Sequence, residues 1–180
     1  FFLQRAKKNR LFSKPLSLAL CCIGNIVADT YFYCYSLPLE AGSVILPGNW
    51  GRILNTYTPE TSPNSWLLVR ELVFEKVRIT DFPEKPSRFE SIFLCQSKED
   101  IEEFRNINNR KLDLIYEVEL LDSDNPIHIA EITLANLQNI DNTSIFSERA
   151  RKYWGGKEIT KSEVVTTSRI RVIKALENAT

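Results

Sequence analysis

The chain has 180 residues but no methionine, a single histidine and four cysteines, which limits the metal sites it can build. A structural zinc site needs about four nitrogen or sulfur ligands. Cys21 and Cys22 are adjacent, and Cys34 and Cys95 have no zinc-ligand spacing, so we expect no metal. Each cysteine lies in an apolar run, where a buried thiol is the ordinary state. We therefore expect a reducing compartment, the cytoplasm of the producing cell or of a target cell.

Familiar nucleotide-binding and hydrolase motifs are also missing. The sequence contains neither GxxxxGK[ST] nor GxGxxG, which argues against a P-loop or a Rossmann dinucleotide site. A Ser-His-Asp triad would have to use His128, which lies in a β-prone stretch, and there is no nucleophile elbow. We therefore interpret His128 as a structural residue.

The sequence has no excess of either charge and no apolar run long enough for a membrane. Lys plus Arg and Asp plus Glu both number 23, so net charge does not separate a protein partner from a nucleic acid. The apolar run at residues 16–28 is shorter than the roughly 20 residues that span a bilayer. We expect no membrane partner.

Residues 1–29 are treated as an N-terminal segment, and residues 30–180 as one domain, because 180 residues suffice for one core and are few for two. The N-terminal segment has two interpretations. Basic residues before an apolar run are typical of a secretory leader. A packed helix or strand is the alternative.

Apolar periodicity and turn residues predict an α+β domain. Strands are predicted at residues 30–37, 88–95 and 114–121 and in two segments of 163–176. Helices are predicted at residues 66–78, 98–108 and 144–154, with caps at Asn64 or Ser65, at Ser97, and at Thr143 or Ser144. Residues 39–54 are expected to be a loop around one brief strand, and 128–137 to be strand or helix.

The helix at 66–78 is predicted to be amphipathic. Its apolar stripe consists of Trp66, Val69, Val73 and Val77. Charged residues, Arg70 and Glu71 among them, lie between these positions and are expected to face solvent.

Four segments, read in order, resemble the ADP-ribosyltransferase superfamily, closest to a bacterial branch of toxins, secreted effectors and phage-defence enzymes. They are YFYCYSL, GSVILPGNWGRIL, PSRFESIFLCQSKEDIEEF, and ARKYWGG followed by EVVTTSRIRVIKAL. The resemblance implies a split β-sandwich of two small, roughly perpendicular sheets flanked by helices. It also implies that the last two strands form a hairpin that opens with a catalytic glutamate, Glu163.

The resemblance further implies that NAD is the substrate and that ADP-ribose is moved to a macromolecular acceptor, protein or nucleic acid. A fixed carboxylate such as Glu163 stabilises the positive charge that develops on the ribose when the nicotinamide bond breaks. An antitoxin or other inhibitor protein is an expected partner. The alternative interpretation of Glu163 is an exposed glutamate at a strand end.

The remaining site residues follow from the same resemblance. Asn49, Trp50 and Arg52 would contact the dinucleotide, with Gly48 and Gly51 allowing close approach of the backbone. The alternative is a tight turn with Trp50 as a core residue.

Ser91 and Phe93 would lie beneath the nicotinamide, and Arg88 would contact phosphate or cap its strand. Phe93 could equally be a core residue. Cys34 and Ser36 occupy the first strand, where the family places an Arg or His followed by Ser or Thr. The thiol at Cys34 departs from the pattern, which leaves a non-catalytic binding module and an NAD glycohydrolase as alternative functions.

Overall fold

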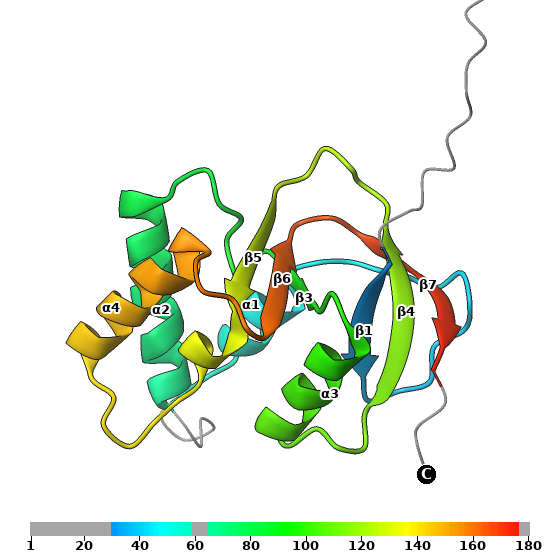
Figure 1. Ribbon diagram of the computed structural model, residues 1–180, viewed down its shortest axis with the longest axis horizontal. Coiled ribbons are helices and arrows are strands. Elements are labelled where there is room, and N and C mark those ends of the chain that lie inside the picture. The colour runs from blue at the N-terminus through cyan, green and yellow to red at the C-terminus, as the bar shows by residue number, and fades with distance from the viewer. Residues whose placement is uncertain (1–29, 59–64, 177–180) are drawn as a thin grey trace, which may run out of the picture.

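The computed structural model describes residues 30–58 and 65–176, which form an α+β fold with two antiparallel sheets (Figure 1). The larger sheet has the strand order β1 (Tyr31–Tyr35), β4 (Leu114–Leu120), β7 (Ile170–Ala175) and β2 (Val44–Ile45). The smaller sheet has the order β3 (Ile92–Leu94), β6 (Ser162–Thr166) and β5 (Ile127–Glu131). The predicted α+β class with two small sheets and flanking helices is confirmed.

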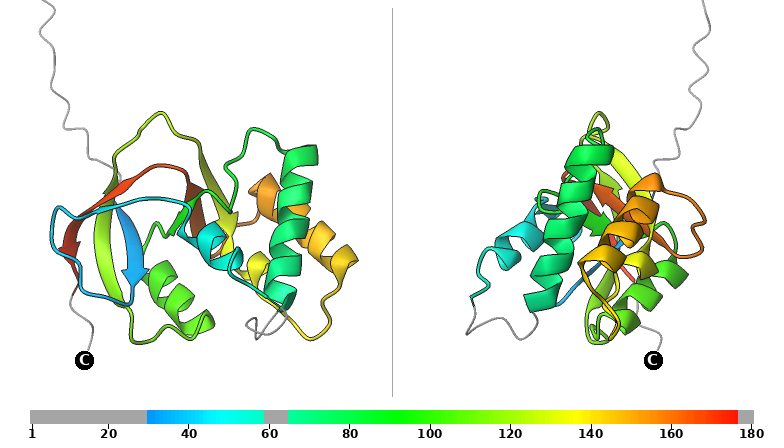
Figure 2. Two further views of the ribbon diagram at one scale, coloured as in Figure 1. Left: turned by 180° about the vertical axis from the view of Figure 1, so that it is seen from behind. Right: turned by 90° about the vertical axis from the view of Figure 1, so that its left-hand side faces the viewer.

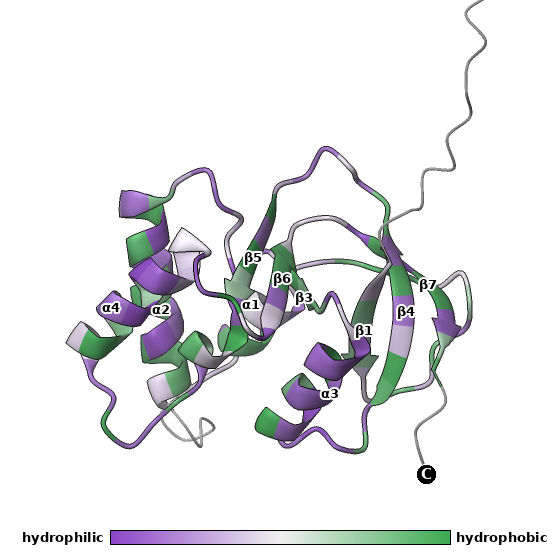
Figure 3. Ribbon diagram, in the orientation of Figure 1, coloured by the Kyte–Doolittle hydropathy of each residue, from purple (hydrophilic) through white to green (hydrophobic). Residues whose placement is uncertain are grey.

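The helices cover the two sheets unequally. They are α1 (Asn49–Leu54), α2 (Ser65–Asp81), α3 (Lys98–Ile107), α4 (Thr143–Gly155) and the short 3₁₀ helix η1 (Ile132–Ala135). Helices α2 and α4 pack on each other beside the smaller sheet, and α3 lies against β1 (Figures 1 and 2). Most of α3 is hydrophilic (Figure 3), so only a narrow stripe of it packs inward.

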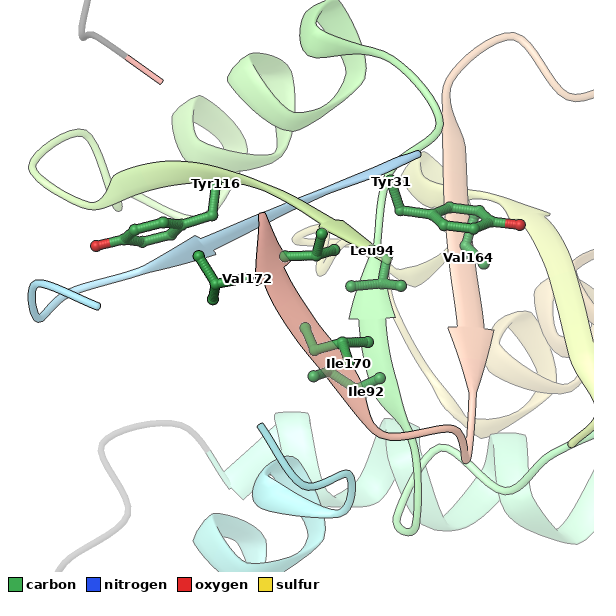
Figure 4. Close-up of a cluster of buried hydrophobic side chains, with 8 residues drawn as sticks. Tyr31, Ile92, Leu94, Tyr116, Val164, Ile170 and Val172 are labelled. Atoms are coloured by element: carbon green, nitrogen blue, oxygen red, sulfur yellow. The ribbon is translucent and has the colours of Figure 1, made fainter. Parts of the chain in front are cut away.

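The main core fills the space between the sheets. Leu94 of β3 and Val164 of β6 meet Ile170 and Val172 of β7 there, and all four are at most 1% exposed (Figure 4). A second core joins α2 and α4 to the smaller sheet through residues such as Phe74. The two sheets are therefore held by one continuous set of apolar contacts.

The sheets also touch edge to edge. Phe32, in β1, and Cys95, just after β3, exchange both backbone hydrogen bonds at 2.9 Å. This single bridge brings the outer strand of the larger sheet beside the outer strand of the smaller one. The candidate site lies at this junction.

The expected final hairpin is not formed. Strand β6 pairs with β3 and β5, whereas β7 pairs with β4 and β2. Every residue of β6 is buried, so this strand needs neighbours on both edges and cover on both faces. The buried positions of β7 alternate with exposed ones in its first half, as suits a strand with one solvated face.

The amphipathic stripe predicted for α2 is confirmed at Val77, which is 6% exposed, but it is wrong at Trp66 and for the charged residues. Trp66 is 47% exposed, whereas Arg70 and Glu71 are only 7% and 1% exposed. The buried face of α2 is formed by Arg70, Glu71, Phe74 and Val77. Glu71 pairs with both Arg70 and Arg88, so burying these charges does not leave a lone charge in the core.

Other boundaries differ by smaller amounts. Ser97 caps α3 as predicted, accepting a hydrogen bond from the Asp100 amide. The cap of α4 is Asn142, one residue before the predicted ones, because its side chain reaches two amides of the first turn. Gly156 ends α4 in the left-handed conformation.

Three further segments depart from the expectations in length or type. Residues 49–54 form the helix α1 where a loop was expected, and the strand expected from residue 88 starts only at Ile92. Residues 127–135 hold both a strand and a 3₁₀ turn. The expectations for residues 1–29 and for Asn64 lie outside the described residues. In the described part, no helix is long and apolar enough to cross a membrane.

Candidate functional site

A pocket of about 450 Å³ lies at the junction of the two sheets, beside α1. Its walls come from β1, α1, α2, β3, the end of α3, η1 and β6. Of the nine residues that the sequence nominates for the site, seven line it: Cys34, Asn49, Trp50, Arg88, Ser91, Phe93 and Glu163.

Glu163 lies in the wall of this pocket and is only 3% exposed. Its backbone pairs with Ala130 of β5 in the middle strand of the smaller sheet, which makes its position rigid. Arg88 Nη1 donates to its Oε2 at 2.5 Å, and the Tyr153 hydroxyl donates to the same oxygen. Among the described residues no donor reaches Oε1, so one oxygen is held and the other is left for a ligand.

Arg88 is the hub of the charges around Glu163. Its Nη1 also donates to the Tyr153 hydroxyl, and its Nε donates to Glu71 Oε2 at 2.9 Å. Its Cζ lies 4.6 Å from the ring centroid of Phe93, a cation–π contact. Burial alone would lower the pKa of Arg88, but Glu163 and Glu71 raise it well above its usual value. Arg88 is therefore a permanent cation whose donors already have partners.

Two further groups complete a neutral buried charge cluster, defined as Arg70, Glu71, Arg88 and Glu163. Arg70 pairs with Glu71 and also donates to the backbone oxygen of Ala135. Burial raises the pKa of Glu71, but Arg88 and Arg70 outweigh burial and lower that pKa to about 2. Both carboxylates and both guanidiniums thus balance in a low-dielectric region.

Tyr153 connects α4 to this cluster. Burial raises the pKa of its hydroxyl well above the usual value, although Arg88 opposes the effect. The hydroxyl therefore keeps its proton and donates it to Glu163 while accepting from Arg88. The sequence nominated neither Tyr153 nor Glu71 for the site, and Glu71 was expected to face solvent. A charged pair inside the apolar run LLVRELVF was the signal that could have revealed Arg70 and Glu71.

The helix α1 supplies another wall of the pocket. Asn49 and Trp50 line it, and Trp50 Nε1 is buried without a hydrogen-bond partner among residues 30–58 and 65–176. A Cβ on Gly51 would lie 2.2 Å from the carbonyl oxygen of Phe89. The close backbone approach expected at Gly51 is therefore made to residue 89, which fixes α1 against the turn that precedes β3.

Two nominated residues lie away from the pocket. Ser36 is exposed in the bend after β1 and is not part of the lining. Arg52 is exposed on α1, where its Nη1 donates to the Pro47 carbonyl at 3.2 Å. Ser91 does line the pocket, but its hydroxyl donates to the Ser87 carbonyl at 2.6 Å, which holds the turn before β3.

The end of the pocket near β1 is aromatic and carries one cation. Burial raises the pKa of Cys34 to about 11, with Arg110 lowering it only in part, so this group is a thiol. Arg110 lines the pocket, donates weakly to the Cys34 carbonyl at 3.5 Å and is paired with Asp113. The rings of Tyr33 and Tyr35 stack with centroids 6.1 Å apart. An arginine from the α3–β4 turn thus lies beside the thiol.

His128 fits its structural interpretation. It is 4% exposed, its Nε2 lies 2.9 Å from the carbonyl oxygen of Tyr153, and its ring packs against Trp154. Burial lowers its pKa. Among the described residues, no group of three or more His, Cys, Asp or Glu side chains could hold a metal ion.

No curated protein matches the chain. Residues 50–178 match the model of a family described as "Protein of unknown function (DUF2441)". The matched span contains Glu71, Arg88, Tyr153 and Glu163. It begins after β1, so Cys34 lies outside it. Since this span covers more than half of the sequence, the protein belongs to the DUF2441 family.

Proposed function

We propose that this protein is an NAD-dependent ADP-ribosyltransferase that moves ADP-ribose to a macromolecular acceptor. One observation carries the proposal: residues nominated by a resemblance in four separate segments gather in one pocket, with Glu163 in its wall. Their positions in the sequence range from Cys34 to Glu163, so an unrelated fold would have no reason to bring them together.

The chemistry assigns a specific task to Glu163. In the transfer, the bond between ribose C1′ and the nicotinamide nitrogen breaks, and its electron pair leaves with neutral nicotinamide. Positive charge develops on the ribose and is stabilised by a carboxylate held nearby. The acceptor then bonds to C1′ and loses a proton. Glu163 Oε1, which receives no hydrogen bond from a described residue, is the oxygen that would face the ribose.

The charge of the pocket wall supports a dinucleotide. Arg70, Arg88 and Arg110 line the pocket, and Glu163 is the single acidic residue in the described lining. Arg70, Arg88 and Glu163 are balanced with Glu71 in the neutral buried charge cluster, so the support comes from Arg110, a partly exposed guanidinium beside Asp113 that could contact a pyrophosphate. Arg88 is saturated by its partners, so Arg110 at the open end is the better candidate for phosphate contact.

Aromatic side chains support the binding of flat rings. Phe93 and Trp50 line the same pocket as Glu163, and Trp50 Nε1 is a buried donor without a partner among the described residues. A nicotinamide carboxamide offers both a ring to stack and an acceptor for such a donor. The acceptor of ADP-ribose, protein or nucleic acid, and a role in defence or attack with an inhibitor partner remain parts of the proposal that come from the resemblance.

The test compares labelling of macromolecules from tagged NAD by the wild type and by Glu163→Gln. We expect nicotinamide release and labelling to fall at least about 100-fold, because the charge-stabilising carboxylate is lost. Glu119→Gln is the matched control, since Glu119 is a strand carboxylate that pairs with Arg171 outside the pocket lining. It should keep wild-type activity.

Two results would contradict the proposal. Equal activity of Glu163→Gln and wild type would remove the proposed role of this residue. No binding of NAD at millimolar concentration by calorimetry would leave a binding module that keeps only the fold. Free ADP-ribose without any labelled macromolecule would instead indicate a glycohydrolase that uses water as the acceptor at the same site.

A further inference from the structure

We propose that Arg88 and Tyr153 are positioning residues for Glu163, and that Glu71 acts on the pocket through Arg88. This inference rests on the proposed function in assigning Glu163 the catalytic role. It differs from the sequence expectation, in which Arg88 contacts phosphate or caps its strand and Glu71 faces solvent.

The first argument is the direction of the hydrogen bonds. Arg88 Nη1 and the Tyr153 hydroxyl both end on Oε2 of Glu163, and Arg88 also donates to the hydroxyl. The three groups form a closed ring in which every proton has one defined acceptor. The carboxylate therefore cannot rotate without breaking two charge-assisted bonds, and Oε1 keeps one orientation.

The second argument is the position of Glu71. It does not line the pocket and is 1% exposed, yet it binds Arg88 through both of its oxygens, at 2.9 Å and 3.3 Å. Two contacts at the Nε and Nη2 edge set the plane of the guanidinium, and the plane sets where Nη1 points. Glu71 therefore acts on Glu163 indirectly: it orients Arg88 from one side, and Arg88 holds Glu163 on the other.

The third argument is that simple stability would not require this arrangement. Replacing a buried ion-pair cluster by apolar side chains is often neutral or stabilising, so four buried charges are weak evidence for a purely structural role. Here two arginines and Glu163 face the pocket, while Glu71 and Tyr153 stand behind them. The cluster thus has a ligand side and a support side.

The decisive variant is Tyr153→Phe, which removes one hydroxyl and keeps the ring. We expect kcat for nicotinamide release to fall about tenfold while KM for NAD changes less than about twofold, because one charge-assisted bond to Glu163 is lost. Glu71→Gln should lower kcat in the same way, without touching the pocket lining.

The matched control is Tyr116→Phe. The Tyr116 hydroxyl is held by the backbone of Leu37 and Leu39 in the larger sheet, and Tyr116 is 1% exposed. Loss of this hydroxyl should lower the unfolding midpoint as much as Tyr153→Phe does, yet leave kcat unchanged. If Tyr153→Phe behaves like this control, the positioning role is overturned.

A second readout does not need activity. Carbon-13 NMR of labelled glutamate carboxyls at pH 7, with the Glu163 signal assigned from its absence in Glu163→Gln, reports the hydrogen bonding of this carboxylate. We expect the chemical shift of this signal to change in Tyr153→Phe, which removes a donor to Oε2, and to stay the same in Tyr116→Phe. No change in Tyr153→Phe would overturn the inference even if NAD is cleaved. If the wild type cleaves no NAD but the Glu163 signal changes in Tyr153→Phe, the positioning role is supported and only the proposed function is contradicted.

Discussion

Buried carboxylates in this protein differ in how many of their oxygens are occupied. Both oxygens of Glu131 are taken: Oε1 accepts from the amide and hydroxyl of Thr133, and Oε2 accepts from Thr160 and the Lys161 amide. Within the described part of the chain, Glu163 has donors on one oxygen only. The bonds of Glu131 hold the loop before β6 against β5, whereas Oε1 of Glu163 is an acceptor available to a ligand.

Glu131→Gln should lower the free energy of unfolding by about 2 kcal/mol at pH 7, because charge-assisted bonds to the loop before β6 are weakened. Burial alone would raise the pKa of Glu131, but hydrogen bonds from Lys161 and Thr160 lower it to about 2. A lowered pKa means that the unfolded chain binds protons first as pH falls from about 4.5.

Stability contributed by Glu131 is therefore present above about pH 4.5 and is lost as pH falls toward 2. Urea unfolding at pH 7 and at pH 3 measures this loss. The difference between the wild type and Glu131→Gln should shrink at pH 3. A difference that stays constant with pH would show that the carboxylate charge is not responsible.

At the scale of elements, α1 is held by backbone contact. Gly51 packs against the carbonyl oxygen of Phe89, where a Cβ would be only 2.2 Å away. Gly51→Ala should therefore push α1 away from the turn before β3, cost about 1–3 kcal/mol of stability and weaken NAD binding several-fold. Thermal unfolding and calorimetric titration measure the two effects.

Gly155→Ala is the control for this substitution. Nothing lies within 4 Å of a Cβ at Gly155, and this residue ends a regular helix. Its unfolding midpoint should stay the same or rise slightly, since Ala is the better helix former. Equal destabilisation by the two substitutions would contradict the packing argument for α1.

The elements differ in how well the sequence predicts them. Strand β4 and helix α3 were predicted because alternation and the Ser97 cap are local signals. Helix α1 was missed because six residues flanked by glycine and proline carry little periodicity. The prediction that Arg70 and Glu71 of α2 face solvent was wrong, because the ion pairs of Glu71 with Arg70 and Arg88 form only in the folded chain. These ion pairs allow charged side chains to be buried where the sequence pattern predicts exposure.

At the scale of the whole molecule, one core between the two sheets should make unfolding cooperative. Leu94 is fully buried in that core, whereas Leu112 is 94% exposed. Leu94→Ala should cost about 2–5 kcal/mol and weaken both sheets together. Leu112→Ala should change stability by no more than about 0.5 kcal/mol. Urea unfolding followed by far-UV circular dichroism and by tryptophan fluorescence tests both the size and the single transition.

The sequence predicted the α+β class and nominated seven of the residues that line the pocket, but it did not predict how the segments meet. Glu163 and Phe93 could be nominated because segment order resembles a family. Three features depend on contacts between distant segments. They are the placement of β6 and β7 in different sheets, the hydrogen bond from Arg88 to Glu163, and the position of Arg110 beside Cys34. Such contacts leave no periodic trace in a single sequence.

The most direct test of the central claim is a crystal structure of Glu163→Gln with NAD, a variant expected to bind the dinucleotide without consuming it. We predict the nicotinamide ring over Phe93 and a ribose hydroxyl within hydrogen-bond reach of residue 163. NAD bound elsewhere, or no NAD in this pocket at millimolar concentration, would contradict the account.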